Sequence, residues 1–567
     1  MNLHKKQNYY SLAFVLAGLL PLIYAATQYL NADLWWDEIL SLVQSSLAGF
    51  GSTVTNYQDA NNHVFFNILT GLALKVRGVR DIDGALDHAR YMRSMQLAFS
   101  VLTVVYVYYF AKRFIGEGAA SLSVVLLSTT IPFLNFAMQL RGYSLSMLLA
   151  AALLFHLWSY LVQSSKFHAI MISITAFLLL YTIPSNIYFV TSLIAAIGIE
   201  YAVRRIFKNP AAGFSGKKVL FGLIFIAIGC MIAALAYFPL LKQILDCRFV
   251  SKAAVTRFYV PCTIFPSVSF MFLSSRYLLP AMMAIGVGVG IVRLFTTWTS
   301  SGPMTSFIRL SLLYMGPFIV SFARNDMPFD RSFVMLAPVF SLLLASGTSL
   351  FIATLSSNPK ISRIAAMAAA LYCLATCGWS LHTIQQVLKN DIAIGTRHQD
   401  LLRNSYQSCL WKPIVDLEML ATACRKNPCP IMVFGDVDKV AVNYYLERLK
   451  LTDYYYIMLK HDNFGNPLYI ESHPDPLSGR IFEQFDLGRS FHMKDDDDGL
   501  FVRLFMQMLM SHTLALHGSC YVITASPQRF TILLRSLSAG FDPVRINADD
   551  SYTTIFRITV PTSIYLP

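Results

Sequence analysis

Apolar runs long enough to cross a lipid bilayer recur along most of this chain. An α-helix rises 1.5 Å per residue, so about 20 apolar residues span the hydrocarbon core. The recurrence predicts an all-α polytopic membrane bundle of about eleven transmembrane helices. The runs cover residues 11–29, 94–111, 118–138, 144–163, 168–183, 186–203, 219–241, 270–292, 306–322, 333–354 and 364–384.

The composition agrees with this class, because 55% of the 567 residues are hydrophobic and only 14% are charged. These values exclude an ordinary soluble enzyme of this length. Lys5 and Lys6 precede the first run, but no small-residue cleavage site closes it, so we interpret the run as a retained anchor. The shorter run at 64–74 predicts a re-entrant or surface-lying helix.

The net charge of +13 is explained first by membrane topology. Basic residues gather in alternate loops, which the positive-inside rule makes cytoplasmic. The opposite side is not poor in arginine, so either the topology differs or those arginines have a function outside. They are Arg77, Arg80, Arg90, Arg93, Arg141, Arg248, Arg257, Arg276, Arg324 and Arg331.

Three regions follow from the pattern. Residues 30–93 form a long first outer loop, and residues 1–385 as a whole form the transmembrane domain. Residues 386–567 alternate between strand-like and helix-like stretches and predict a soluble α/β domain on the outer side. The expected strands lie at 430–436, 454–459, 520–525 and 554–560, and the expected helices at 438–449 and 499–516.

Cysteines and acids give weaker signals. An oxidising outer compartment would allow a bridge such as Cys409–Cys424 or Cys247–Cys262. No Cys-x-x-Cys or nearby histidine pair completes a metal set, so we expect no metal site. The run KDDDDG at 494–499 reads as a solvated loop before a helix, with a calcium loop as the weaker alternative.

The stretch DLWWDEILSLVQ, residues 33–44, follows the first run directly. Trp35 and Trp36 fit the interface, where they would hold Asp37 and Glu38 at the membrane surface. Adjacent residues on a helix point in different directions, so the two carboxylates would serve different roles. A helix start capped by acids is the simpler alternative.

Other polar groups fall on the same predicted side. Asp59, Asn62 and His63 precede an apolar helix, either as an N-cap cluster or as the wall of a site. Arg141 and Tyr143 lie where two apolar spans meet, and Arg276 and Arg331 lie near the ends of other apolar spans. The planar guanidinium group can donate two hydrogen bonds to one phosphate. Together, the arginines predict an outward-facing, cationic pocket at the level of the membrane surface. Each arginine taken alone is more often an interfacial side chain.

The ordered set of motifs resembles the membrane C-type glycosyltransferases that use polyprenyl-phosphate sugars, in the bacterial group related to protein O-mannosyltransferases and the lipid A aminoarabinose transferase. The carrying stretches are WWDE, DANNH-VFFNIL, ARYMRSMQLAFS, FIGEGAASLSVVLLSTTIPFLNFAMQLRGYSLSMLL and FDRSFVMLAPVFSLLLASG, within residues 1 to 350. Asn61 and Asn62 stand where the group has prolines, and Ser332 where it has a tyrosine, which affects the acceptor side most.

The resemblance implies a transferase that moves a sugar from a polyprenyl phosphate to an acceptor hydroxyl, with inversion. It assigns general base to Asp37 and loop or acceptor binding to Glu38. Donor phosphate would be bound by Arg141, then Arg331, with Arg93, Arg276 and Tyr143 in support. Asp59, His63 and Asn62 would line the acceptor or sugar side. No cofactor, metal or nucleic acid is implied; the partners are the lipid donor, a glycan, lipid or protein acceptor, and membrane lipids.

The resemblance also implies a bacterial inner membrane, with the site and the C-terminal domain facing the periplasm. Two other functions remain open from the residues. A transporter or flippase for a lipid-linked glycan would carry polar mid-span residues and an internal repeat, and neither is evident. A membrane assembly protein would act through its outer domain.

Overall fold

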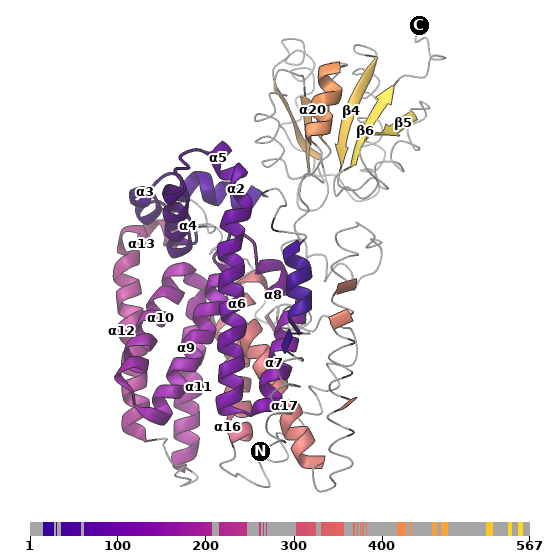
Figure 1. The fold of residues 1–567 in the computed structure, drawn as a ribbon. Coiled ribbons are helices and arrows are strands. Elements are labelled where there is room, and N and C mark those ends of the chain that lie inside the picture. Colours follow the sequence, from indigo (N-terminus) through magenta and orange to yellow (C-terminus); the bar gives the residue numbers. More distant parts are fainter. Residues whose placement is uncertain are drawn as a thin grey trace. The chain divides into compact units, whose positions relative to one another are not determined.

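The computed structural model describes two compact units, each taken separately below (Figure 1). The first comprises Met1–Asn31, Leu40–Gln385 and Ile394–Leu410; the second comprises Ala32–Ile39, Gln386–Ala393 and Trp411–Pro567. Within them, the described residues are 36–57, 62–206, 215–246, 302–324, 330–355, 417–426, 431–433, 456–461, 467–473, 518–524, 542–546 and 554–559, with scattered residues at 15–34, 260–268 and 364–382.

The first unit is helical (Figure 1). Its long helices are α6 (Ala89–Phe114), α9 (Tyr143–Gln163), α10 (Lys166–Thr182), α11 (Ile187–Ile206), α12 (Gly216–Tyr237), α16 (Gly302–Arg324) and α17 (Ala337–Leu355). Shorter elements are α3 (Phe50–Thr55), α4 (Val64–Val76), α5 (Ile82–Asp87), α7 (Glu117–Thr129), α8 (Ile131–Phe136), α13 (Leu241–Asp246), the π-helix η1 (Leu42–Ser46) and the 3-10 helices η2 (Pro184–Asn186), η3 (Phe238–Leu240) and η6 (Asp330–Leu336). Helix α2 (Trp36–Ser41) precedes η1 directly.

Six helical segments of the described chain are long and apolar enough to span a bilayer, which indicates a multi-pass membrane protein. They are Ala89–Phe114, Tyr143–Gln163, Pro184–Ala202, Gly216–Ile244, Ser306–Arg324 and Arg331–Leu350. Shorter apolar helices cover Gly18–Thr27, Val64–Val76, Glu117–Thr129 and Lys166–Thr182. The expected span at 270–292 lies outside the described residues, so the prediction of about eleven helices stays a prediction.

Helices α10 and α12 lie side by side and run parallel. Ser173 Oγ donates to the carbonyl oxygen of Phe225 at 2.8 Å, and Tyr237 Oη donates to the carbonyl oxygen of Leu180 at 3.0 Å. Between these contacts, a Cβ on Gly229 would meet the Ser173 carbonyl oxygen at 2.5 Å. The glycine therefore permits the close helix approach that membrane helices use in place of a hydrophobic driving force.

The described part of the predicted first outer loop folds into short helices. Asp81 caps α5 by accepting from the backbone N–H of Gly84 at 2.8 Å. Helix α4 has only 13 residues, which agrees with the expectation that this run does not span. Tyr57 and Val64 pack with Tyr181 and Tyr237, so the loop is fastened onto α10 and α12.

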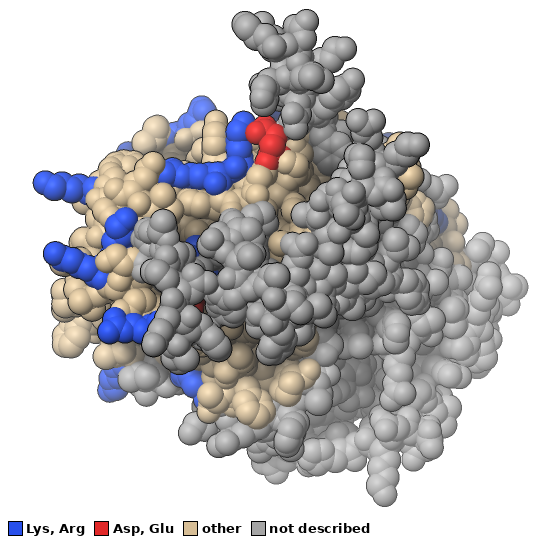
Figure 2. Space-filling view, turned by 90° about the horizontal axis from the view of Figure 1, so that it is seen from below, with Lys and Arg blue, Asp and Glu red and all other residues tan. Residues whose placement is uncertain are grey.

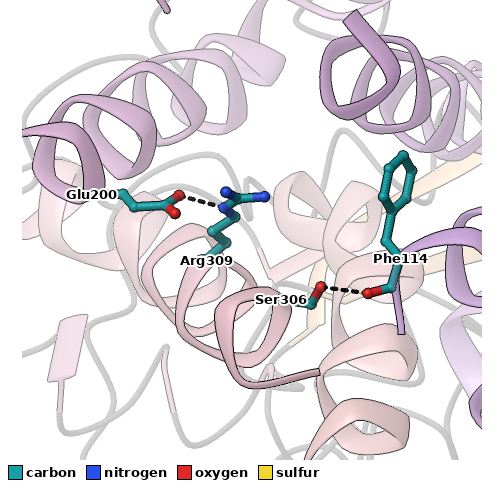
Figure 3. Close-up of polar contacts among 4 residues, drawn as sticks. All are labelled: Phe114, Glu200, Ser306 and Arg309. Carbon is teal, nitrogen blue, oxygen red and sulfur yellow. Dashed lines mark hydrogen bonds and ion pairs between the residues drawn. The ribbon is translucent and has the colours of Figure 1, made fainter. Parts of the chain in front are cut away.

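A buried ion pair joins two long helices at one end of the unit. Figure 3 shows Glu200 of α11 accepting from Arg309 of α16, and Ser306 donating to the carbonyl oxygen of Phe114 at 3.0 Å. The Arg309 guanidinium also lies 5.3 Å from the ring centroid of Trp158. Arg309 is therefore part of a contact between helices, where a charge is tolerated because it is paired.

The second unit contains α20 (Leu417–Lys426) and a six-stranded sheet in the order β3-β2-β1-β4-β6-β5. The strands are β1 (Ile431–Val433), β2 (Tyr456–His461), β3 (Pro467–His473), β4 (Ser519–Thr524), β5 (Asp542–Arg545) and β6 (Thr554–Thr559). β1 pairs in parallel with β2 and β4, and the outer strands pair antiparallel. β1, β2, β4 and β6 lie where strands were expected; the expected helices at 438–449 and 499–516 lie outside the described residues.

Candidate active site

The turn between α8 and α9 carries a buried arginine. Arg141 is 1% exposed, and its Nη1 donates to Ser41 Oγ at 3.0 Å. Ser41 is the last residue of α2, so this bond connects the first outer loop to the turn. A buried guanidinium needs partners on most of its five N–H groups, which holds its side chain in one orientation.

The next residue, Gly142, brings His63 to the same turn. The Gly142 N–H donates to His63 Nδ1 at 2.7 Å. A Cβ on Gly142 would lie 2.8 Å from Thr182 Cγ2 and 3.1 Å from His63 Cβ, so glycine is required by this close approach. Tyr143 completes the cluster, with its ring centroid 5.0 Å from that of His63 and 5.9 Å from the Arg141 guanidinium.

Burial holds the pKa of His63 well below its usual value of 6.5, and the positive charges of Arg141 and Arg331 lower it further. His63 is therefore neutral near pH 7. Since Nδ1 accepts the Gly142 N–H, the single imidazole proton sits on Nε2, which remains a donor. Because Arg141 and Arg331 both lower the pKa of His63, Arg331, the second residue of η6, lies in the same environment as Arg141. Two of the predicted arginines thus belong to one electropositive cluster.

A stripe of polar residues on α6 lies behind this turn. Arg93, Gln96, Ser100 and Thr103 are buried, although α6 is a candidate span. Ser144 Oγ donates to Gln96 Oε1, and Ser100 Oγ donates to the Ala137 carbonyl oxygen at 3.0 Å. Gln96 was missed by sequence reasoning; its spacing of three and four from Arg93 and Ser100 was the available signal.

Asn62 holds the loop that presents His63. Its Nδ2 donates to the carbonyl oxygen of Asn56 at 2.8 Å, and its Oδ1 accepts from Asn67 Nδ2 at 2.8 Å and from Ser45 Oγ at 3.5 Å. These bonds connect η1, α3 and the start of α4. Asn62 was predicted on the acceptor side; in the structure its side-chain amide fixes the position of the neighbouring histidine.

The two carboxylates of α2 are both buried, Asp37 at 2% and Glu38 at 0% exposed. Adjacent residues of a helix point about 100° apart, and the prediction that the two carboxylates serve different roles stays a prediction. Asp37 lies four residues, about one helical turn, before Ser41 in α2. Trp36–Ile39 belongs to the second unit and Ser41 to the first. A buried carboxylate is costly without compensation, so both need hydrogen-bond or ionic partners.

The remaining predicted residues are only partly described. Asp59 and Arg276 lie outside the described residues, as do Cys247, Cys262 and Cys409 of the possible disulfides. Among the residues that the structure describes, no group of three or more His, Cys, Asp or Glu could hold a metal ion. The described part of the cluster is therefore built from guanidinium, imidazole, hydroxyl and main-chain N–H groups.

No family model matches the sequence of this chain. No curated protein matches it either. Among solved structures, the chain is similar to ArnT from Cupriavidus metallidurans bound to undecaprenyl phosphate, at 11% identity and a TM-score of 0.44, covering 98% of this chain and 99% of that one.

The chain is also similar to the archaeal oligosaccharyltransferase AglB from Archaeoglobus fulgidus in complex with an inhibitory peptide and a dolichol-phosphate, at 11% identity and a TM-score of 0.40, covering 80% and 69%. TM-scores below 0.5 leave the function to be argued from the site residues. The solved neighbours, ArnT and AglB, are membrane glycosyltransferases.

Proposed function

We propose that this protein is an integral-membrane glycosyltransferase that moves a sugar from a polyprenyl phosphate to an acceptor hydroxyl on the outer face of the membrane. The observation that carries the proposal is the cluster of the buried Arg141 and His63 with the partly buried Arg331 at the end of a membrane-spanning bundle. The solved neighbours contain undecaprenyl phosphate or dolichol phosphate, and the proposal takes a donor of that chemical class.

The cluster suits a phosphate that leaves the sugar. Two guanidinium groups supply positive charge where the departing phosphate gains negative charge. The Nε2–H of neutral His63 offers a donor to the sugar beside that phosphate without adding a third cation. Arg93, Tyr143 and Arg276 take supporting roles in the proposal. Because phosphate leaves readily once its charge is compensated, no protein acid has to protonate it.

The acceptor hydroxyl needs a base, and the proposal assigns that role to Asp37. Asp37 shares one face of α2 with Ser41, the residue that binds Arg141. The acceptor oxygen attacks the anomeric carbon from the face opposite the phosphate, its proton passes to the Asp37 carboxylate, and the carbon–phosphate oxygen bond breaks. One displacement inverts the configuration at that carbon.

The acceptor and sugar side is assigned to Asp59 and His63, with Asn62 holding the loop and Glu38 orienting it or binding the acceptor. The proposal places the protein in the bacterial inner membrane, with the site and the C-terminal domain toward the periplasm. The positive-inside distribution of lysine and arginine supports that orientation.

The test uses the purified full-length protein and a panel of undecaprenyl-phosphate sugars. We expect one or more of them to release undecaprenyl phosphate in the presence of a suitable acceptor, with the anomeric product of inverted configuration. Asp37→Asn should insert and fold but lose turnover. If Asp37→Asn supported release at the rate of the unchanged protein, the transferase assignment would be wrong and a transporter or assembly function would take its place.

A further inference from the structure

The end of the helical unit opposite the Arg141 turn carries a group of basic side chains. Helix α9 begins beside Arg141 and, at 21 residues, is about 30 Å long, which is the thickness of the hydrocarbon core. Around its far end lie Lys112, Arg113, Lys166, Arg205, Lys217 and Lys218. Figure 2 looks onto this end and shows blue side chains projecting around its described surface.

Contacts between helices place these residues on one surface. Lys218 Nζ donates to the Val162 carbonyl oxygen near the end of α9, at 3.1 Å. The Arg113 guanidinium lies 6.0 Å from the Phe155 ring of the same helix. A Cβ on Gly216 would touch Tyr201 of α11, whose hydroxyl accepts from Arg205 at 3.2 Å. The ends of α6, α9, α11 and α12 therefore meet here.

Lys166 and Lys218 lie at the same depth. Helices α10 and α12 are parallel and joined by the bond from Ser173 to Phe225. Lys166 precedes Ser173 by seven residues, and Lys218 precedes Phe225 by seven residues. Two neighbouring helices of equal rise thus present lysines at one level, about 10 Å beyond that bond. Lys217 adds a third ammonium group beside them.

Exposed apolar side chains follow these lysines on the same helices. Phe167 and Ile170 on α10 are 61% and 59% exposed, and Leu220 on α12 is 58% exposed. Val162 at the end of α9 is also exposed. Along this surface, the lysine ammonium groups are followed by exposed apolar side chains. A phospholipid has the matching order, a charged headgroup followed by acyl chains.

We propose that this surface binds an anionic diacyl phospholipid, with the headgroup phosphate at Lys166, Lys217 and Lys218 and the acyl chains along Phe167, Ile170 and Leu220. Charge complementarity argues for this occupant over a zwitterionic lipid: basic residues between membrane helices attract anionic headgroups. Two acids described near the surface are already paired, Glu117 with Lys112 at 3.1 Å and Glu200 with Arg309. The site is distinct from the Arg141 cluster, which lies at the other end of α9, so neither proposal depends on the other.

The test measures lipid preference in the full-length protein. The protein is reconstituted in phosphatidylcholine nanodiscs with a small fraction of dansyl-labelled phosphatidylglycerol, and energy transfer from its tryptophans, Trp158 of α9 among them, is recorded. Unlabelled phosphatidylglycerol should displace the labelled lipid at a mole fraction about fivefold or more below that of phosphatidylcholine. Salt at about 0.5 M should weaken this preference.

Three variants decide the outcome. Lys166→Gln, Lys217→Gln and Lys218→Gln together should abolish the preference, whereas arginine at the same three positions should keep it. Lys75→Gln, Arg80→Gln and Arg90→Gln, which remove three exposed cations from the first outer loop, should also keep it. Equal loss in the outer-loop control, retained preference in the lysine-to-glutamine protein, or equally effective displacement by inorganic phosphate would each overturn the proposal.

Discussion

Arg141 Nη1 donates to Ser41 Oγ at 3.0 Å, a bond between residues 100 positions apart in the chain. It joins the turn before α9 to the helix that also carries Asp37. The position of the Arg141 guanidinium is therefore fixed by the last residue of α2.

Replacing Arg141 by lysine should lower turnover about 100-fold with an undecaprenyl-phosphate sugar. Lysine keeps the charge but loses the planar fork that donates two bonds to one phosphate. Initial rates at several donor concentrations measure the effect. Arg80→Lys, at an exposed position between α4 and α5, serves as the matched control and should leave the rate unchanged. A full rate in Arg141→Lys would mean that only charge is needed at this position.

The two adjacent carboxylates should behave differently. Asp37→Asn should reduce turnover by about two to four orders of magnitude, the range over which a positioned general base contributes. Glu38→Gln should reduce it less, because a residue that orients the loop acts on binding more than on proton transfer. Rates and donor KM measured for both variants separate the roles. Equal losses in the two variants would contradict the assignment of the base to Asp37.

Gly142→Ala should destabilise the folded protein by about 1–3 kcal/mol and reduce activity. The new methyl group would lie 2.8 Å from Thr182 Cγ2 and would push His63 away from the turn. Thermal unfolding in detergent and turnover measure the two effects. Gly118→Ala in α7 is the matched control: its added methyl group would meet nothing within 4 Å, so its thermal midpoint should stay the same or rise.

His63 should make stability fall with decreasing pH. Its pKa in the folded protein lies well below 6.5, the value it has when unfolded. Above pH 6.5 both states are neutral at this group, and the histidine contributes no pH dependence. Below pH 6.5 the unfolded state takes up a proton that the folded state does not, so the folded state loses up to about 1.4 kcal/mol per pH unit.

Thermal midpoints between pH 7.5 and pH 5.5 measure this slope. His63→Gln keeps an acceptor for the Gly142 N–H and does not titrate, so the part of the slope due to His63 should disappear in that variant. An identical slope in the two proteins would place the pH dependence elsewhere.

Removing one partner of the buried ion pair should destabilise the protein more than replacing both partners. Glu200→Gln leaves the Arg309 guanidinium without its carboxylate and should cost about 3 kcal/mol of stability. Glu200→Leu combined with Arg309→Met removes both charges and should recover most of that loss. Unfolding of the unchanged protein, of the Glu200→Leu and Arg309→Met single variants and of the double variant gives the coupling energy; losses that simply add would contradict a direct interaction between the pair.

The apolar runs predicted the long helices well, since length and hydropathy alone decide whether a helix can span. They predicted one helix over 118–138, whereas the structure has α7 and α8. Thr130 between them is extended, and Pro132 lies in the first turn of α8, where proline is tolerated best. The signal was present in the proline, but the uninterrupted apolar composition concealed it.

Two strands of the second unit were missed for a physical reason. β3 and β5 are the edge strands of the sheet, and β5 includes Pro543. Edge strands face fewer neighbours, so they tolerate proline and carry a weaker apolar pattern. The central strands, which are packed on both sides, had the stronger pattern and were found.

The site was predicted by residue type more than by arrangement. Arg141 and His63 could be chosen from the sequence because charged and polar groups beside apolar runs need an explanation. That the Gly142 N–H would bind His63, or that Gln96 would lie behind the turn, depends on how α4, α6 and α9 pack. No local pattern encodes contacts between segments so far apart in the chain.

The main-chain bond to His63 limits what this histidine can do in catalysis. An imidazole that relays a proton must accept at one nitrogen and release at the other, and here Nδ1 accepts a hydrogen bond from the Gly142 N–H. This bond favours the tautomer with the proton on Nε2. A proton taken from the acceptor hydroxyl would therefore remain on an aspartate until it is released to bulk water.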